Sequence, residues 1–182
     1  MRKIRLDRFW VVAITLFTIV TFGFADTDWG NSSAAGGNRL KGTVMADFDG
    51  DGEPDLACIE TEGYLYVKSS KYAQTKKYHV CYLGEPTSMI QGDFDGKQGL
   101  DIITGDSNGD LYLFHNDGQG GFSIRKKTKL GHVSNVISGL GATYNEQESD
   151  YDLIATFSDE SKAVLRNVRR YYESKLFLSY IN

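Results

Sequence analysis

The chain has 182 residues, and its 24 acidic side chains outnumber its 20 basic ones, which gives a net charge of −4. An acidic chain without a patch of basic and aromatic residues argues against a nucleic acid as the partner. Cys58 and Cys81 are the only cysteines.

Residues 1–25 have the organisation of a secretory signal peptide. Four basic residues precede an uncharged run, 9–25, which ends in a small-x-small pattern before Asp26. Cleavage after Ala25 leaves 157 residues, the size of one domain, and moves the net charge to −7. An uncleaved anchor is the alternative, because the run is only slightly shorter than the ~20 residues that a bilayer requires. We expect a protein that is secreted or at the cell surface, periplasmic if the source is bacterial, with no membrane span in the mature chain.

Residues 26–38 are polar and rich in Gly, Ser and Ala, which predicts a flexible lead-in. The folded domain is therefore expected to occupy 39–182. Its most informative stretch is the acidic loop at 47–55, with the sequence DFDGDGEPD.

The acidic loop has the composition of a calcium site. Ca²⁺ takes about six to eight oxygen ligands, and a glycine at the sixth position, Gly52, permits the tight turn. The expected ligands are the side chains of Asp47, Asp49, Asp51 and Asp55 and the backbone carbonyl of Glu53. An EF-hand would need a glutamate at position 12, where this chain has Cys58, and helices where it has strand-like flanks. A metal-free turn is the remaining alternative.

The chain also contains an internal repeat. Residues 47–50 recur at 93–96 and residues 63–67 recur at 109–113, both with a shift of 46. A third, decayed copy follows at a shift of 51, where 152–154 echo 101–103. A period in the forties with four short strands per copy is typical of propeller blades.

The strands of the three copies are expected at the following positions. In the first copy they are 40–46, 56–60, 64–69 and 76–83; in the second 88–92, 102–105, 110–115 and 121–129; in the third 133–143, 153–157, 163–168 and 172–181. The predicted fold class is all-β, a partial β-propeller of about three four-stranded antiparallel blades at 39–85, 86–131 and 132–182.

The aspartate loop and the glycine-rich segment 116–122 (NDGQGGF) resemble the FG-GAP/VCBS repeats of integrin-α-type β-propellers. The resemblance covers about 40–129 well and the remainder weakly. It implies a loop that joins the first two strands of a blade and binds Ca²⁺. Propellers of that family close with about seven blades, so three blades cannot close a ring alone.

The second and third loops depart from the calcium pattern. In the second loop Asp93, Asp95 and Asp101 remain, but Lys97 stands at position 5 and Gln98 replaces the glycine. We expect an internally neutralised, metal-free loop, with weak Ca²⁺ binding as the alternative. The third loop, 142–151, has lost the aspartate pattern and should bind nothing.

No catalytic residue is predicted. The G-x-S-x-G match at 105–109 is followed by a strand-like run, whereas a nucleophile elbow needs a helix there. The three histidines show no ligand spacing and are expected to be structural. Cys58 and Cys81 fall on strands two and four of one blade, beyond disulfide reach, so we expect small buried side chains; whether they are bonded stays open.

The expected function is extracellular recognition of, or adhesion to, a protein or glycan by a non-catalytic, calcium-binding repeat protein. The alternatives are an accessory domain of a secreted carbohydrate-active or other hydrolytic enzyme, and a decayed gene product. Three blades leave two uncovered faces, with apolar residues such as those at 56–59 and 153–157. We therefore expect self-association or docking to another propeller-like chain. Lys162, Arg166, Arg169 and Arg170 are expected to cap one end only.

Overall fold

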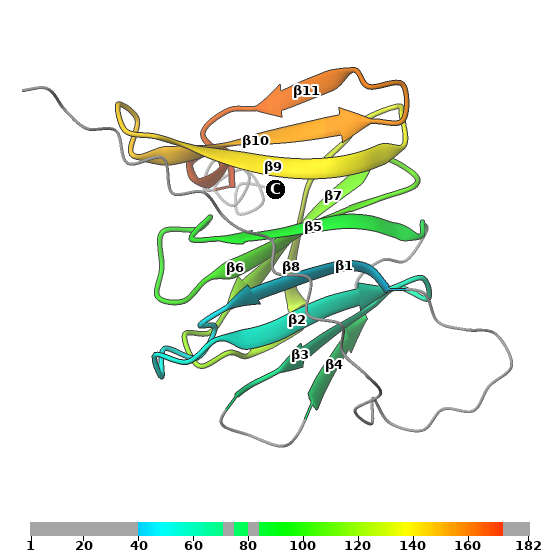
Figure 1. Ribbon diagram of the computed structural model, residues 1–182. Coiled ribbons are helices and arrows are strands. Elements are labelled where there is room, and N and C mark those ends of the chain that lie inside the picture. Colours follow the sequence, from blue (N-terminus) through cyan, green and yellow to red (C-terminus); the bar gives the residue numbers. More distant parts are fainter. Residues whose placement is uncertain (1–39, 71–74, 80–83, 173–182) are drawn as a thin grey trace, which may run out of the picture. The chain divides into compact units, whose positions relative to one another are not determined.

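The computed structural model describes residues 40–70, 75–79 and 84–172, all within the unit Gly36–Asn182. Over these residues eleven strands form three antiparallel sheets (Figure 1). The first sheet holds β1 (Leu40–Ala46), β2 (Asp55–Glu60), β3 (Tyr64–Lys68) and β4 (Thr75–His79). The second holds β5 (Pro86–Gly92), β6 (Asp101–Asp106), β7 (Asp110–Asn116) and β8 (Phe122–His132). The third holds β9 (Ile137–Asn145), β10 (Asp150–Phe157) and β11 (Lys162–Leu165).

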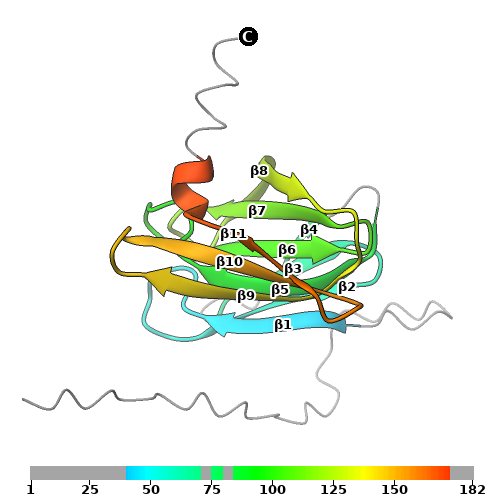
Figure 2. The same ribbon diagram turned by 90° about the horizontal axis from the view of Figure 1, so that it is seen from above.

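Each sheet is a meander in which neighbours in sequence are neighbours in space. The sheets follow one another in chain order, and their first strands lie together, β1 against β5 and β5 against β9 (Figures 1 and 2). The all-β class is confirmed, as are the positions of the strands in the first two copies, apart from a few residues at their ends. Residues 80–83 of the predicted strand 76–83 lie outside the described residues, as do the predicted signal peptide at 1–25 and lead-in at 26–38.

The same backbone contact recurs in every sheet. A carboxylate on the second strand accepts a hydrogen bond from the N–H group fifteen residues later: Asp55 from Ser70 (2.8 Å), Asp101 from Asn116 (2.9 Å) and Asp152 from Asn167 (2.9 Å). The turn between the second and third strands recurs as well. Gly63, Gly109 and Glu160 have positive φ, and each N–H group donates to the carbonyl three residues earlier. These contacts confirm the internal repeat with its shifts of 46 and 51.

Two hydrophobic clusters join the sheets. The first lies between the first and second sheets and contains Phe48, Ala57, Ile59, Leu65, Val67, Met89, Ile102, Tyr112, Phe114 and Phe122. The second lies between the second and third sheets and is built around Phe94, Ile103, Leu111, Leu113, Leu130, Ile137, Leu153, Ala155 and Phe157. Because successive strand residues point to opposite faces, the second sheet supplies side chains to both clusters, and β6 and β7 are buried throughout.

The end of the third copy differs from the prediction. Strand β11 ends at Leu165 rather than Val168, and a short helix spans 168–172, where one strand was predicted to end and the next to begin. The carboxylate of Asp150 accepts hydrogen bonds from the N–H groups of Arg169 and Arg170 (both 3.1 Å). It thus satisfies donors that the first turn of a helix leaves open. The predicted fourth strand, 172–181, lies outside the described residues except for Tyr172, which is helical.

The prediction of large apolar patches on the outer faces is wrong for most of the residues named. Ala57, Cys58 and Ile59 are buried, and so are Leu153 and Phe157. Successive side chains on a strand point to opposite faces of the sheet, so every second residue of 56–59 and of 153–157 faces the neighbouring sheet. On the outer face of the third sheet, Thr156 and Lys162 stand where the repeat places the buried Gly105 and Leu111 of the second sheet. Val164 lies on the same face as Lys162 and is 53% exposed, so this face is polar only in part.

Cys58 has a free thiol that is only 2% exposed, as predicted, whereas Cys81 lies outside the described residues. Burial, with a smaller contribution from Glu60, raises the pKa of the Cys58 thiol to about 11. Since the thiolate is the reactive form, Cys58 should react slowly with a thiol-specific disulfide reagent at pH 8 while the protein is folded, and readily in denaturant. A Cys81→Ser variant isolates this signal. Fast labelling of that variant without denaturant would contradict the buried position of Cys58.

Candidate metal centre in the first acidic loop

The first acidic loop connects β1 and β2 and is shaped by its glycines. Gly50 and Gly52 have φ values of 75° and 88°, which favour glycine. The turn brings three backbone N–H groups onto Asp47: those of Gly50 (2.7 Å), Asp51 (3.1 Å) and Gly52 (2.9 Å). The loop therefore folds over the side chain of its own first residue.

Three carboxylates converge inside this loop. Asp47, Asp49 and Asp55 each offer one oxygen, and these oxygens lie within 4.8 Å of one another. Asp55 is buried and also accepts the N–H of Phe48 (2.9 Å). Asp51 is exposed, lies outside this group of three, and accepts the N–H of Glu53 (2.9 Å). The structure thus brings together three of the four predicted side-chain ligands.

One oxygen of this group lacks a partner. Asp49 Oδ2 accepts a hydrogen bond from the Ser69 hydroxyl (2.8 Å), while Asp49 Oδ1 is buried and accepts none. A buried carboxylate oxygen without a partner is costly, and neighbouring negative charges add to that cost. A hard divalent cation would satisfy this oxygen and offset the charge, because such ions prefer oxygen ligands. The three carboxylates therefore fit a hard divalent cation.

The second sheet holds the first acidic loop in place. The side-chain amide of Asn116 donates to the carbonyls of Phe48 (2.7 Å) and Leu100 (3.0 Å), and so ties the first loop to the second. Gly120 lies so close that a Cβ there would be 3.1 Å from Asp49 Cβ. The sequence analysis used the segment 116–122 only for the family resemblance, and nothing in a single sequence indicates this contact between sheets.

A cleft of about 250 Å³ separates the two acidic loops. Asp47 and Gly50 line it from the first loop, and Gly118 lines it from the β7–β8 turn. The second loop contributes Asp93 and residues 97–100. The cleft carries charges of both signs, with a carboxylate of the first loop facing the same space as Lys97.

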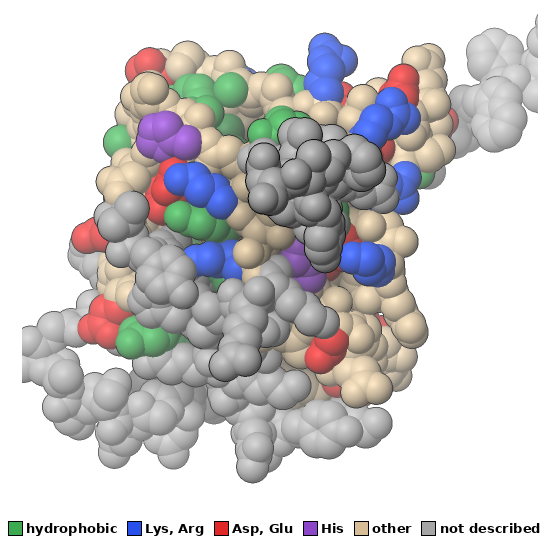
Figure 3. Space-filling model, turned by 180° about the vertical axis from the view of Figure 1, so that it is seen from behind, with side chains coloured by type: hydrophobic (Ala, Val, Ile, Leu, Met, Phe, Trp, Pro, Cys, Tyr) green, Lys and Arg blue, Asp and Glu red, His purple; other side chains and the backbone are tan. Residues whose placement is uncertain are grey.

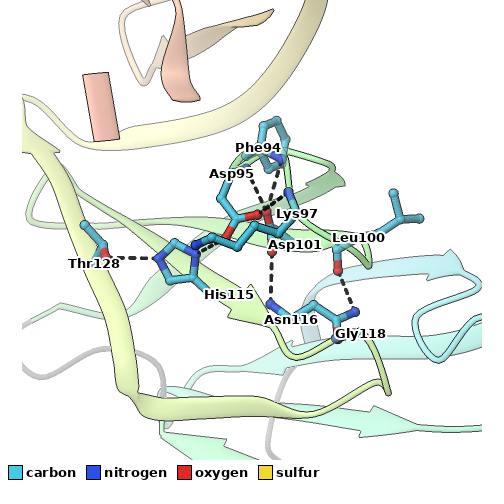
Figure 4. A network of polar contacts seen from close by, with 9 residues as sticks. All are labelled: Phe94, Asp95, Lys97, Leu100, Asp101, His115, Asn116, Gly118 and Thr128. Carbon is cyan, nitrogen blue, oxygen red and sulfur yellow. Dashed lines mark hydrogen bonds and ion pairs between the residues drawn. The ribbon is translucent and has the colours of Figure 1, made fainter. Parts of the chain in front are cut away.

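In the second loop, basic groups contact the carboxylate equivalent to Asp49 (Figure 4). Asp95 Oδ2 lies 3.2 Å from Lys97 Nζ and 2.8 Å from His115 Nδ1. The predicted contact between the Lys97 ammonium and this loop is confirmed. Burial alone would raise the pKa of Asp95, but hydrogen bonds from His115 and Lys97 hold it below its usual value.

His115 is a member of this cluster that the histidine spacing did not reveal. Its signal is the repeat itself, because a shift of 46 places His115 at the position of Ser69, and both donate to the equivalent carboxylate at 2.8 Å. The other ring nitrogen of His115 lies 3.1 Å from Thr128 Oγ1. His132 instead contacts Asp110 (2.8 Å), and the side chain of His79 is not described.

Asp101, the first residue of β6, is the buried carboxylate at the end of the second loop. It is 1% exposed and accepts the N–H groups of Phe94 (3.1 Å), Asp95 (3.0 Å) and Asn116 (2.9 Å). Burial, together with the charge of Asp95, raises the pKa of Asp101 to about 7. Asp95, Asp101 and His115 offer atoms within 4.8 Å of one another, but each oxygen already has a donor, in contrast to Asp49.

The remaining predicted features have structural roles. In the third loop, Asn145 accepts the N–H groups of Gln147 and Glu148, and the described residues bring no group of metal-ligating side chains together there. The segment 105–109 joins β6 to β7, so the G-x-S-x-G match lies in a hairpin, as predicted. No helix in the described part of the chain is both long and apolar enough to cross a bilayer.

Comparison with known proteins does not identify a family for this chain. No protein-family model matches the chain, and no curated protein matches it. Among solved structures, it is similar to a crystal structure of BBS1N in complex with ARL6DN, soaked with lead, with 13% sequence identity and a TM-score of 0.41. The match covers 70% of this chain and 51% of that one, so the chain spans about half the length of that protein.

Proposed function

We propose that this protein is an exported, calcium-binding repeat protein of the FG-GAP/VCBS type, which recognises a protein or glycan outside the cell without catalysis. The observation that carries the proposal is the convergence of Asp47, Asp49 and Asp55, with the buried Asp49 Oδ1 lacking a partner. Asp47, Asp49 and Asp55 would hold the ion, and Asn116 of the second sheet would position the loop through its hydrogen bond to the Phe48 carbonyl. A bound calcium ion would therefore stabilise the loop against which the second sheet packs.

The proposal includes a propeller-like arrangement of three blades. Its support is the recurrence of one sheet pattern, with β1, β5 and β9 adjacent and hydrophobic clusters between successive sheets. The outer face of the first sheet carries the half-buried Leu56 and Tyr66, and that of the third carries the exposed Val164 beside Lys162. Self-association, or docking to another propeller-like chain, is proposed through these outer faces.

Calcium binding is tested by titration calorimetry on the mature chain. We expect one site and a rise in melting temperature, because Ca²⁺ at a hundred times its Kd adds about 2.7 kcal/mol to the free energy of unfolding. Asp49→Asn should weaken binding strongly, and Asp51→Lys, which copies the second loop, should abolish it. Asp159→Asn makes the same charge change in an exposed turn of the third sheet and should bind as the wild type does. Absence of binding heat, together with no effect of EDTA on melting, would contradict the proposal.

A further inference from the structure

Three aromatic rings form a row from the second sheet to the third. Phe94, in the loop between β5 and β6, contacts Tyr151 of β10, with ring centroids 5.2 Å apart and an interplanar angle of 67°. Tyr151 in turn contacts Tyr144 of β9 at 5.0 Å and 66°. The β5–β6 loop and the β9–β10 turn lie at the same end of their sheets (Figures 1 and 2). We call Phe94, Tyr151 and Tyr144 the aromatic row.

The aromatic row leads from the core to the solvent. Phe94 is buried, Tyr151 is half-buried, and Tyr144 is 52% exposed. Tyr144 stands directly opposite Tyr151, on the same face of the third sheet as the buried Leu153, which packs against the second sheet. In the described part of the chain, the Tyr144 hydroxyl has no hydrogen-bond partner. The row therefore supports an exposed ring at the end of the space between two sheets.

A carboxylate without a partner lies beside the aromatic row. Asp93 directly precedes Phe94 and is exposed, and none of the hydrogen bonds or ion pairs among the described residues involves it. Burial, followed by the negative charge of Asp93, raises the pKa of the Tyr151 phenol, so the carboxylate is close to that ring. Asp93 also lines the cleft between the two acidic loops. An available hydrogen-bond acceptor thus lies between the aromatic row and this cleft.

We propose that Tyr144 and Asp93 bind a neutral oligosaccharide, with the Tyr144 ring stacking on a sugar ring and the Asp93 carboxylate accepting hydrogen bonds from its hydroxyl groups. A sugar ring has an apolar face of C–H groups and a polar edge of hydroxyls, so it matches an aromatic ring beside a carboxylate. A charged sugar acid or sulfated sugar would be repelled by Asp93 and by the exposed Glu146 of the β9–β10 turn. The inference rests on the proposed glycan-recognising function and names the class of glycan and its site.

A protein partner fits this surface less well, because a stable protein interface buries about 800 Å² on each side around an apolar centre. Tyr144 has no such surroundings. The other large exposed apolar side chains that the structure describes lie at the opposite ends of their strands or on the outer faces of the first and third sheets: Leu40, Val136, Met45 and Val164. Seen from behind, the visible hydrophobic side chains form small, separate groups (Figure 3).

The experiment titrates cellohexaose, chitohexaose and xylohexaose, each separately, into the mature chain at saturating calcium. We expect binding of at least one of them, with a loss of affinity of about tenfold in Tyr144→Ala and in Asp93→Ala. Tyr144→Phe keeps the ring and should change the affinity less than about threefold. Glu62→Ala is the control for Asp93→Ala, because it removes an exposed carboxylate from the β2–β3 turn of the first sheet, and it should bind as the wild type does.

Cross-strand packing is the competing role for the aromatic row. If packing is its whole role, Tyr144→Ala will lower the melting temperature and leave the affinity for the oligosaccharide unchanged. Asp93→Ala removes an exposed side chain and so tests the site without loss of packing; an affinity equal to that of Glu62→Ala would overturn the inference. A wild type that binds calcium but none of the three oligosaccharides would overturn the inference alone. Absence of calcium binding would instead contradict the proposed function.

Discussion

Replacing Asp101 by alanine is expected to lower the free energy of unfolding by about 3–5 kcal/mol. The reason is that the N–H groups of Asp95 and Asn116 lose their acceptor in a buried part of the protein. The N–H group of Phe94 loses one of two acceptors, because it also donates to the Gly92 carbonyl (3.0 Å). Each buried donor left without a partner costs about 1–3 kcal/mol, and local rearrangement recovers part of the total. Urea denaturation of the variant and the wild type measures the difference.

Asp117→Ala is the matched control for this substitution. Asp117 also accepts backbone N–H groups, from Gln119 and Gly121 (both 2.9 Å), but it is exposed, so water can replace it. We expect a loss below about 1 kcal/mol. If the two variants were equally stable, the buried network around Asp101 would not be a structural centre of the second sheet.

Gly109→Ala is expected to be nearly as damaging, at a cost of several kcal/mol. Gly109 has φ +83°, and an added Cβ would overlap severely with the Val133 backbone carbonyl oxygen. The clash is with backbone, so no side-chain rotation relieves it. The substitution would separate the β6–β7 turn from the segment after β8, where the Val133 N–H donates to the Gly109 carbonyl (2.9 Å).

The control for Gly109 is Gly50→Ala. Gly50 has a similar φ of +75°, but nothing lies within 4 Å of the position of its Cβ. It should therefore show only the conformational cost, about 1 kcal/mol, when unfolding is measured in EDTA. A loss in Gly109→Ala no larger than in Gly50→Ala would mean that the close approach of Val133 does not restrict this turn.

The sequence predicted the strands of the first two sheets because local pattern and repeat agree there. Alternating apolar residues, turn glycines and the shift of 46 all mark the same boundaries, and β1 was predicted residue for residue. In the third copy the aspartate loop has decayed, so the local residue pattern and the repeat no longer mark the same strand boundaries. The helix at 168–172 depends on Asp150, about twenty residues away, so the local pattern alone did not reveal it.

The candidate site was predictable to the extent that it is local. The spacing of Asp47, Asp49 and Asp55 within one loop predicted their convergence, and the Lys97 substitution predicted an ammonium beside Asp95. The contact of Asn116 with Phe48 joins residues 68 positions apart and comes from the stacking of sheets. The position of His115 could have been found through the repeat, because the shift of 46 aligns it with Ser69. Ser69 donates to Asp49, and the next residue, Ser70, donates its N–H group to Asp55.

The most direct test of the calcium centre is a crystal structure of the mature chain grown in CaCl₂, with data collected at a long wavelength for anomalous scattering. We predict one anomalous peak enclosed by Asp47, Asp49 and Asp55, at bonding distance from Asp49 Oδ1. No peak is expected beside Asp95, where Lys97 and His115 already contact the carboxylate. A first loop without a peak at saturating calcium, or a peak between Asp95, Asp101 and His115 instead, would contradict the account.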